Sequence, residues 1–218
     1  MFKKTQMIRK YLLVLGVIFL AAAPGFAQKA RTLAVEKQLA ELGYMLTKAD
    51  GVADASTRHA VTAFQKVEGL KRTGVINAAL AKALESASRP LPKYTGVGAH
   101  IEVDLTRQVL FMVDDGDKVT HILPVSSGND EKYLDRGKWE VAHTPRGAFD
   151  IYRKINGVRK APLGNLYYPS YFTGGVAIHG SPSIPTTAAS HGCVRIPRFA
   201  DQAIYKMAPI GMTVYVFD

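Results

Sequence analysis

The stretch Ser190-His191-Gly192-Cys193-Val194-Arg195 is the most informative part of the 218-residue chain, because it contains the only cysteine. A single thiol cannot form a disulfide within the chain, and it excludes zinc sites that need two or more cysteines. A free thiol has a pKa of about 8.5 and needs a base or a positive charge nearby to ionise at neutral pH. His191 and Arg195 offer both, so the stretch favours a nucleophilic role for Cys193.

A second histidine, His179, follows the apolar run Val176-Ala177-Ile178, which predicts that it lies at the end of a strand. A rigid strand could hold His179 where it accepts the proton of the Cys193 thiol. If the segment around the cysteine is extended, the side chains of His191 and Cys193 share one face. The N–H groups of Gly192 and Cys193 would then be candidate donors to a substrate oxyanion.

Three further residues are candidates for binding substrate, and two of them, Arg195 and Ser190, also have a structural interpretation. The Arg195 guanidinium could hold a carboxylate in bidentate geometry, or it could lie at the surface before a helix. Gly180 has no Cβ and therefore allows close approach to the site. The Ser190 hydroxyl could orient His191 or hydrogen-bond within its own loop, and we favour the structural role.

Spacing alone leaves three interpretations of Cys193 open. It could form a catalytic pair with His179, or it could be a packed and inert thiol. It could also share a zinc ion with His179, His191 and a carboxylate. The zinc site is the weakest of the three, because the chain has no HExxH motif. We therefore predict neither a metal nor a cofactor.

Residues 1–27 have the pattern of an export signal. Basic residues without acidic ones precede an apolar run, and small residues follow it: Lys3, Lys4, Arg9 and Lys10, then residues 11–23, then Gly25 and Ala27. The run is shorter than the roughly 20 residues that span a bilayer, so an uncleaved anchor is the weaker alternative. We predict a signal peptide over residues 1–27.

Without the predicted signal the formal net charge falls from +10 to +6, because the signal carries four basic residues and no acidic ones. A basic surface suits an acidic extracellular polymer, although ordinary solubilising charge explains it as well. The chain has no nucleic-acid-binding motif, so we predict no nucleic-acid partner.

The spacing of apolar residues in residues 28–86 is typical of helices. Val35, Leu39 and Leu42 recur at intervals of four and three, as on one face of a helix. Asp54 (or Ser56) and Asn77 can cap two further helices. The block therefore predicts a module of three short helices, and the proline-containing residues 87–97 predict a linker.

Residues 98–218 are strand-like. Apolar alternation predicts strands over residues 101–105, 109–113, 119–125, 149–152, 175–178 and 213–217, and one helix over residues 197–207. Asp115-Gly116 marks a hairpin turn between two of these strands. The predicted fold class is an α+β multidomain chain, with a small three-helix N-terminal module and a mainly β second domain.

The order of residues in the helical block resembles the peptidoglycan-binding-domain-1 family. The matching elements are Leu42-Gly43-Tyr44, Asp50-Gly51, Ala60-Val61, Phe64-Gln65 and Gly69-Leu70. The resemblance implies a module that holds the protein on cell-wall polymer. We expect such a module to raise local substrate concentration, so that residues 98–218 alone would still act on small soluble peptides.

The second block resembles the L,D-transpeptidase catalytic domain, the YkuD family. The resemblance rests on His179-Gly180 followed by the cysteine stretch, on Thr144-Pro145-Arg146-Gly147 and on Val125-Ser126-Ser127-Gly128. The loop between His179 and Cys193 is shorter than in many members and carries Ile184-Pro185-Thr186, so we expect its shape to differ.

This resemblance implies a cysteine acyltransferase of the peptidoglycan stem peptide. Cys193 would be the nucleophile and His179 its base and acid, His191 and Gly192 would shape the site, and Arg195 would contact substrate. The products would be 3–3 cross-links or attached proteins, the inhibitors carbapenems, and the location the periplasm or cell wall. An L,D-carboxypeptidase or peptidoglycan hydrolase using the same thiol, and a non-catalytic wall-binding protein, are the alternatives.

Overall fold

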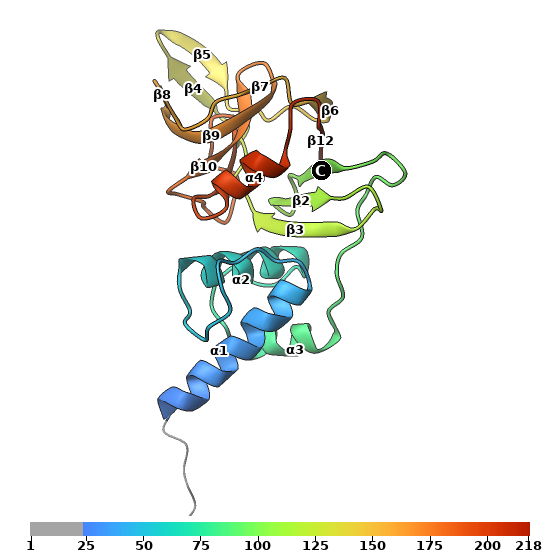
Figure 1. The fold of residues 1–218 in the computed structure, drawn as a ribbon. Helices are drawn as coiled ribbons and strands as arrows, with labels where there is room; N and C mark the ends of the chain where they lie inside the picture. Colours follow the sequence, from blue (N-terminus) through green and yellow to red (C-terminus); the bar gives the residue numbers. More distant parts are fainter. Residues whose placement is uncertain (1–23) are drawn as a thin grey trace, which may run out of the picture.

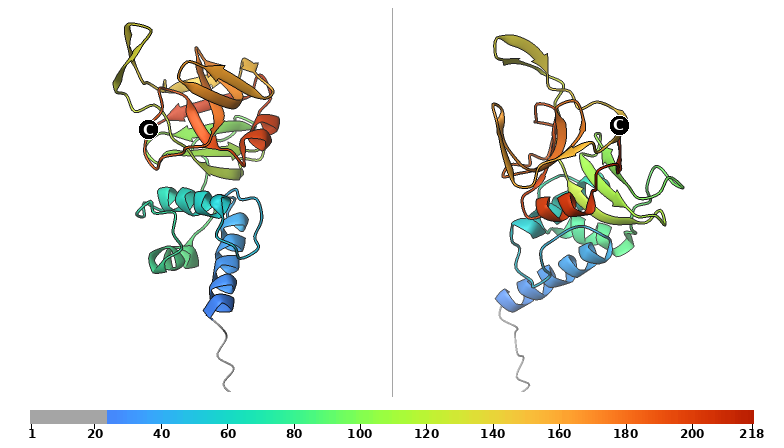
Figure 2. Two further views of the ribbon diagram at one scale, coloured as in Figure 1. Left: turned by 90° about the vertical axis from the view of Figure 1, so that its left-hand side faces the viewer. Right: turned by 45° about the horizontal axis from the view of Figure 1, so that its top comes forward.

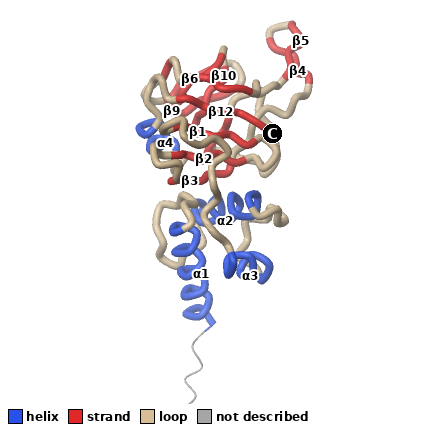
Figure 3. The backbone as a smooth tube through the Cα atoms, turned by 90° about the vertical axis from the view of Figure 1, so that its right-hand side faces the viewer, coloured by secondary structure: helices blue, strands red, loops and turns tan. Residues whose placement is uncertain are grey.

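The computed structural model describes residues 24–218, which form a helical module stacked against a larger β-rich body (Figure 1). Figure 3 shows the same division, with three helices at one end and the strands at the other. The predicted fold class, a three-helix module followed by a mainly β domain, is confirmed. Residues 1–23, which hold most of the predicted signal peptide, lie outside the described part of the chain.

The module contains α1 (Pro24–Glu41), α2 (Ala55–Val67) and α3 (Ala78–Ser86). The Asp54 carboxylate accepts the Thr57 N–H at 2.9 Å, and the Asn77 side chain accepts the Leu80 N–H at 2.9 Å. Both caps satisfy N–H groups that the first turn of a helix leaves unpaired, and they confirm the predicted starts of α2 and α3. α1 is longer than its apolar spacing predicts, and it begins within the residues assigned to the signal.

The first sheet of the body has the strand order β3-β2-β1-β12-β6, in which only β1 and β12 pair in parallel. Its strands are β1 (His100–Asp104), β2 (Val109–Val113), β3 (Val119–Pro124), β6 (Gly147–Asp150) and β12 (Thr213–Phe217). The strands predicted over residues 101–105, 109–113, 119–125 and 213–217 are therefore present, and that over 149–152 is displaced toward its N-terminal side.

The second sheet has the order β11-β10-β9-β7, and β8 also pairs with β9. Its strands are β7 (Arg153–Lys154), β8 (Val158–Ala161), β9 (Gly164–Thr173), β10 (Val176–Ser181) and β11 (Val194–Pro197). The late helix α4 (Asp201–Met207) starts four residues after the predicted position, because Pro197 ends β11 instead of opening the helix. The strand predicted over residues 175–178 is present as β10, whereas β7, β8, β9 and β11 were not predicted from the sequence.

A separate hairpin, β4 (Lys132–Asp135) with β5 (Lys138–Val141), stands out from the body (Figure 2). Neither strand contains a buried residue. Leu134 and Trp139 lie opposite each other in the register, and their side chains are 59% and 71% exposed. Polar and apolar residues alternate in β5, but its apolar residues Trp139 and Val141 are exposed and do not pack on the body.

Strand β2 is buried on both faces and connects two hydrophobic cores. Leu110 and Met112 belong to the core between the two sheets, whereas Val109, Phe111 and Val113 belong to the core that the helices share. This alternation follows from the two-residue period of a strand. The module therefore packs on the body through β2 and β3 as one continuous apolar core.

The module also pairs with the edge of the first sheet. The Met45 N–H donates to the Ile122 carbonyl at 3.0 Å, and the Ile122 N–H donates to the Gly43 carbonyl at 2.8 Å. Strand β3 would otherwise present an unpaired edge to solvent. The contact therefore satisfies backbone groups of the body with groups of the module. None of the helices in residues 24–218 is long and apolar enough to cross a membrane.

Candidate active site

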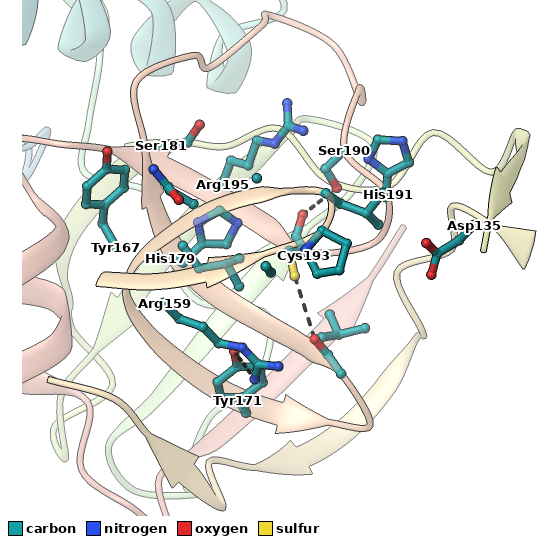
Figure 4. Close-up of a pocket in the computed structure, with 18 of the residues that line it drawn as sticks. Asp135, Arg159, Tyr167, Tyr171, His179, Ser181, Ser190, His191, Cys193 and Arg195 are labelled. Atoms are coloured by element: carbon teal, nitrogen blue, oxygen red, sulfur yellow. Dashed lines mark hydrogen bonds between the residues drawn. The ribbon is translucent and has the colours of Figure 1, made fainter. Parts of the chain in front are cut away.

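A cavity of about 720 Å³ opens on the β-rich body, and both Cys193 and His179 line it (Figure 4). The β4–β5 hairpin borders it with Tyr133 and Asp135, and the β8–β9 hairpin borders it on another side. The two histidines and the cysteine that the sequence singles out thus lie in one cleft. Within residues 24–218, no group of three or more His, Cys, Asp or Glu side chains is placed to hold a metal ion.

Cys193 immediately precedes β11 and is half-buried. Its Sγ lies 3.8 Å from the Gly175 carbonyl oxygen, to which the thiol donates. Burial raises the pKa of the Cys193 thiol, while the Ala177 N–H and the positive charge of Arg195 act against that rise. The thiol is therefore protonated at neutral pH in this arrangement, and it needs a base to become a nucleophile.

His179 lies in β10 and is buried, with 6% of its surface exposed. Its Nδ1 is 2.8 Å from the Gly180 carbonyl oxygen. Since a carbonyl can only accept, Nδ1 carries the proton and Nε2 keeps a free lone pair. Burial, together with the charge of Arg195, lowers the pKa of His179 to about 4, although the hydrogen bond to the Gly180 carbonyl acts against that fall. His179 is therefore neutral at neutral pH and can act as a base.

Among the described hydrogen bonds, none joins Cys193 to His179. Catalytic hydrogen bonds are often long or misaligned before substrate binds, so this geometry is compatible with a catalytic pair.

Gly180 supports His179, and it is not among the residues that line the cavity. Its carbonyl orients the imidazole, and its Cα packs against the buried Asp201 of α4. A Cβ at this position would lie 2.6 Å from the Asp201 Cβ, which no ordinary contact allows. The close approach predicted for Gly180 is therefore made by Asp201, and the residue belongs to the support of the site.

Ser190 and Gly192 form a tight turn before Cys193. The Ser190 hydroxyl donates to the Cys193 carbonyl at 2.5 Å and accepts the Gly192 N–H at 3.0 Å. Both bonds lie within the loop of Ser190 itself, and a contact of Ser190 with substrate stays a prediction. Because the Gly192 N–H is used within the turn, the Cys193 N–H is the remaining candidate oxyanion donor of the pair.

Thr144 connects this turn with Gly128 through hydrogen bonds, and this role of Thr144 was not predicted from the sequence. Its hydroxyl donates to the Gly192 carbonyl at 2.7 Å and accepts the Gly128 N–H at 2.8 Å. Gly128 and Ser190 also form a bridge between their backbones. The three motifs that carried the resemblance, around Gly128, Thr144 and Cys193, thus meet at one point.

His191 is exposed and lies at the rim of the cavity. Its ring is 4.5 Å from that of Tyr133, centroid to centroid, in an edge-on arrangement. This contact joins the β4–β5 hairpin to the cysteine turn. His191 therefore forms part of the cavity rim, whereas His179 is buried.

Four arginines line the cavity: Arg136, Arg153, Arg159 and Arg195. The only acidic residue among the lining residues is Asp135. Within the described residues, Arg153, Arg159 and Arg195 form no ion pair with an Asp or Glu. Arg159 instead donates to the buried Tyr171 hydroxyl at 3.0 Å, and Arg153 stacks on the same ring at 4.1 Å. The cavity is basic and suits an anionic ligand. The pair of basic residues on each side of Asn156-Gly157 was the available sequence signal for Arg153 and Arg159.

The comparison with known families assigns both parts of the chain. Residues 98–216 match the L,D-transpeptidase catalytic domain family, YkuD. The chain belongs to the L,D-transpeptidase family. Residues 28–84 match the family described as a putative peptidoglycan binding domain. Both resemblances predicted from the sequence are confirmed.

Solved structures of L,D-transpeptidases have the same fold. The L,D-transpeptidase from Xylanimonas cellulosilytica is 42% identical, with a TM-score of 0.81 over 85% of this chain and 92% of that one. The L,D-transpeptidase from Stackebrandtia nassauensis is 26% identical, with a TM-score of 0.50 over 86% and 90% of the two chains. No curated protein sequence matches the chain. The first of these relatives includes the module as well as the body, so the two parts occur together in another L,D-transpeptidase.

Proposed function

We propose that this L,D-transpeptidase is an exported enzyme that transfers acyl groups of peptidoglycan stem peptides through a Cys193 thioester. The observation that carries the proposal is that the only thiol shares one cavity with a neutral histidine whose Nε2 is free. A predicted signal peptide supports export to the periplasm or cell wall. The peptidoglycan-binding module supports the cell-wall polymer as the partner.

The proposed first half-reaction forms the acyl-enzyme. His179 Nε2 takes the thiol proton as Cys193 Sγ attacks the carbonyl carbon of the L,D peptide bond. The Cys193 N–H stabilises the charge that develops on the carbonyl oxygen. The C–N bond then breaks, and His179 returns the proton to the amine of the departing terminal D-residue.

In the second half-reaction an amine replaces the departed residue. His179 accepts a proton from the amine of another stem peptide or of a protein as it attacks the thioester, and the thiol is restored. A stem-peptide acceptor yields a 3–3 cross-link, and a protein acceptor yields an attached protein. Water as acceptor would make the enzyme an L,D-carboxypeptidase or a peptidoglycan hydrolase, which is the alternative proposal.

The basic wall of the cavity supports an acidic stem peptide as donor. Arg195 and Arg159 both lie close enough to influence the thiol electrostatically, and neither is neutralised by a described acidic side chain. A guanidinium binds a carboxylate in a bidentate geometry that a lysine cannot reproduce. We propose that these arginines bind carboxylates of the stem peptide beside the attacked bond.

Incubation of the chain without residues 1–27 with tetrapeptide stems tests the proposal by product mass. With an added amine acceptor, we expect loss of the terminal D-residue and gain of the acceptor. Hydrolysed tripeptide as the sole product in the presence of the amine would favour the carboxypeptidase. Unchanged stems would favour a non-catalytic wall-binding protein.

The low pKa of His179 predicts how activity depends on pH. Burial lowers this pKa from 6.5 to about 4, and the imidazolium cannot accept the thiol proton. We therefore expect kcat/KM on a soluble peptide to stay level from about pH 7 to about pH 5, and to halve near pH 4. A pH series of initial rates measures this limb.

Two histidine variants test that assignment. His179→Ala should lower the rate by about 10²-fold or more and abolish the acid limb. His191→Ala is the matched control: it lies at the rim, and its variant should keep the limb of the parent enzyme. An acid limb with an apparent pKa near the ordinary value of 6.5 would contradict the role of a buried His179.

A further inference from the structure

The Lys66 side chain of α2 is buried and extends from the helical module into the body. Its side chain is among the largest fully buried ones, and the residue is 2% exposed. Nζ donates to the Gln108 carbonyl at 3.0 Å and to the Val125 carbonyl at 2.8 Å. Burial lowers the pKa of Lys66 to about 7, and both the amine and the ammonium can donate to these oxygens. Burying such a group is costly unless its donors are used. These two bonds therefore favour one position of the end of α2 relative to the body.

The two acceptors of Lys66 lead directly to the catalytic segment. The Gln108 side chain donates to the Ser127 hydroxyl at 2.7 Å and accepts the Ser127 N–H at 2.9 Å. The Ser127 carbonyl in turn accepts the N–H groups of Ala189 and Ser190, at 2.9 and 2.8 Å. A continuous hydrogen-bonded path therefore runs from Lys66 to the turn that presents Cys193.

The neighbouring residue Ser126 carries a second branch of the path. The Ser126 N–H donates to the Arg195 carbonyl at 3.2 Å, and the Arg195 N–H donates to the Ser126 carbonyl at 3.1 Å. The Ser126 hydroxyl donates to the Thr187 carbonyl at 2.8 Å. Lys66 donates to the Val125 carbonyl, and the next residue, Ser126, bonds to Thr187 before Cys193 and to Arg195 after it. The backbone on both sides of Cys193 is therefore fixed by this segment.

Arg72 of the module reaches the same region independently. Its Nη1 donates to the Thr186 carbonyl at 2.8 Å, and its Nη2 donates to the Thr106 carbonyl at 3.3 Å. Thr186 belongs to the loop that connects His179 with Cys193, whose shape we expected to differ within the family. Two basic side chains of the module, Lys66 and Arg72, therefore hydrogen-bond to the backbone that leads to the catalytic pair.

We infer that Lys66 and Arg72 are positioning residues of the transpeptidase reaction, through which the peptidoglycan-binding module sets the geometry of the Cys193 turn. The inference rests on the proposed role of Cys193. The shared apolar core holds the module on the body, but apolar contacts are not directional. Hydrogen bonds to individual carbonyls are directional, and a misplacement of about 1 Å at a reacting group can cost about 10²-fold in rate. The module is thus part of the active-site support in addition to binding the wall.

The test uses full-length chains without residues 1–27 and a soluble stem peptide too small to reach the module. Arg72→Gln removes the charge-assisted bonds at a half-buried position, and Lys66→Met removes the buried donor at similar length. Lys71→Gln is the matched control, because Lys71 is exposed and adjacent to Arg72. We expect kcat to fall about 10-fold in Arg72→Gln and at least as much in Lys66→Met, with KM nearly unchanged. Lys71→Gln should keep the parent rate.

Arg72→Lys separates positioning from mere stability, because it restores a donor and a charge and should recover part of the lost kcat. Thermal unfolding and the rate of Cys193 acylation are measured on every variant. Parent acylation rates in folded Arg72→Gln and Lys66→Met would overturn the inference, as would a rate loss explained by the unfolded fraction. If Lys66→Met does not fold, Arg72→Gln and Arg72→Lys decide alone. Failure of the parent enzyme to acylate at Cys193 would instead reject the proposed function.

Discussion

Cys193→Ala is expected to abolish transpeptidation and to leave the fold intact. The chain has no second thiol that could take over, and the side chain lines an open cavity. The substitution removes one sulfur atom from a half-buried position, so the loss of folding free energy should stay within about 1 kcal/mol. Product analysis measures the first expectation, and thermal unfolding measures the second.

A carbapenem supplies the control for Cys193→Ala. We expect the parent enzyme to gain the mass of one inhibitor molecule on the peptide that contains Cys193. The alanine variant should gain none under the same conditions. An adduct that persists in Cys193→Ala, or full turnover by that variant, would place the nucleophile elsewhere.

Removal of the helical module, with the chain starting at Val97, is expected to destroy the fold of the body. Five apolar side chains of β2 and β3 would lose their cover: Val109, Phe111, Val113, Val119 and Ile122. Burial of one such side chain stabilises a protein by about 1.5–3 kcal/mol, and a whole domain has a net stability of only about 5–15 kcal/mol. The exposed edge of β3 would add a site for aggregation.

Soluble yield, thermal unfolding and turnover of a soluble stem peptide measure the effect of this truncation. The sequence resemblance predicts the opposite result, because it implies a module that only binds the cell wall. A shortened chain that is folded and turns over the peptide at the parent rate would restore that view. It would also mean that the shared core contributes little to stability.

The parts of the site that are close in sequence or carry marked spacing could be predicted. A lone cysteine between glycine, histidine and arginine, and a histidine at a strand end, are local patterns. The structure brings Cys193 and His179 into one cavity, as these patterns predict. The caps Asp54 and Asn77 were also predictable, because a helix start needs a side-chain acceptor within three residues.

The remaining features depend on partners that leave no mark in the sequence. Lys66 follows the apolar residues of α2 and looks like part of a solvated face, yet its acceptors are carbonyls 42 and 59 positions away. Any residue can supply a carbonyl, so no residue type signals the contact. The use of the Gly192 N–H by Ser190 is likewise a matter of backbone direction, which composition does not determine.

The β4–β5 hairpin has a consequence for the evolution of the enzyme. It borders the cavity with Tyr133 and Asp135, yet none of its residues is buried. Exposed substitutions usually change stability by no more than about 0.5 kcal/mol. Mutations can therefore accumulate in this hairpin and remodel one wall of the cleft while the rest of the protein stays unchanged. The turn around Cys193, by contrast, is held by hydrogen bonds from Ser190 and Thr144, so substitutions there would disturb the site itself.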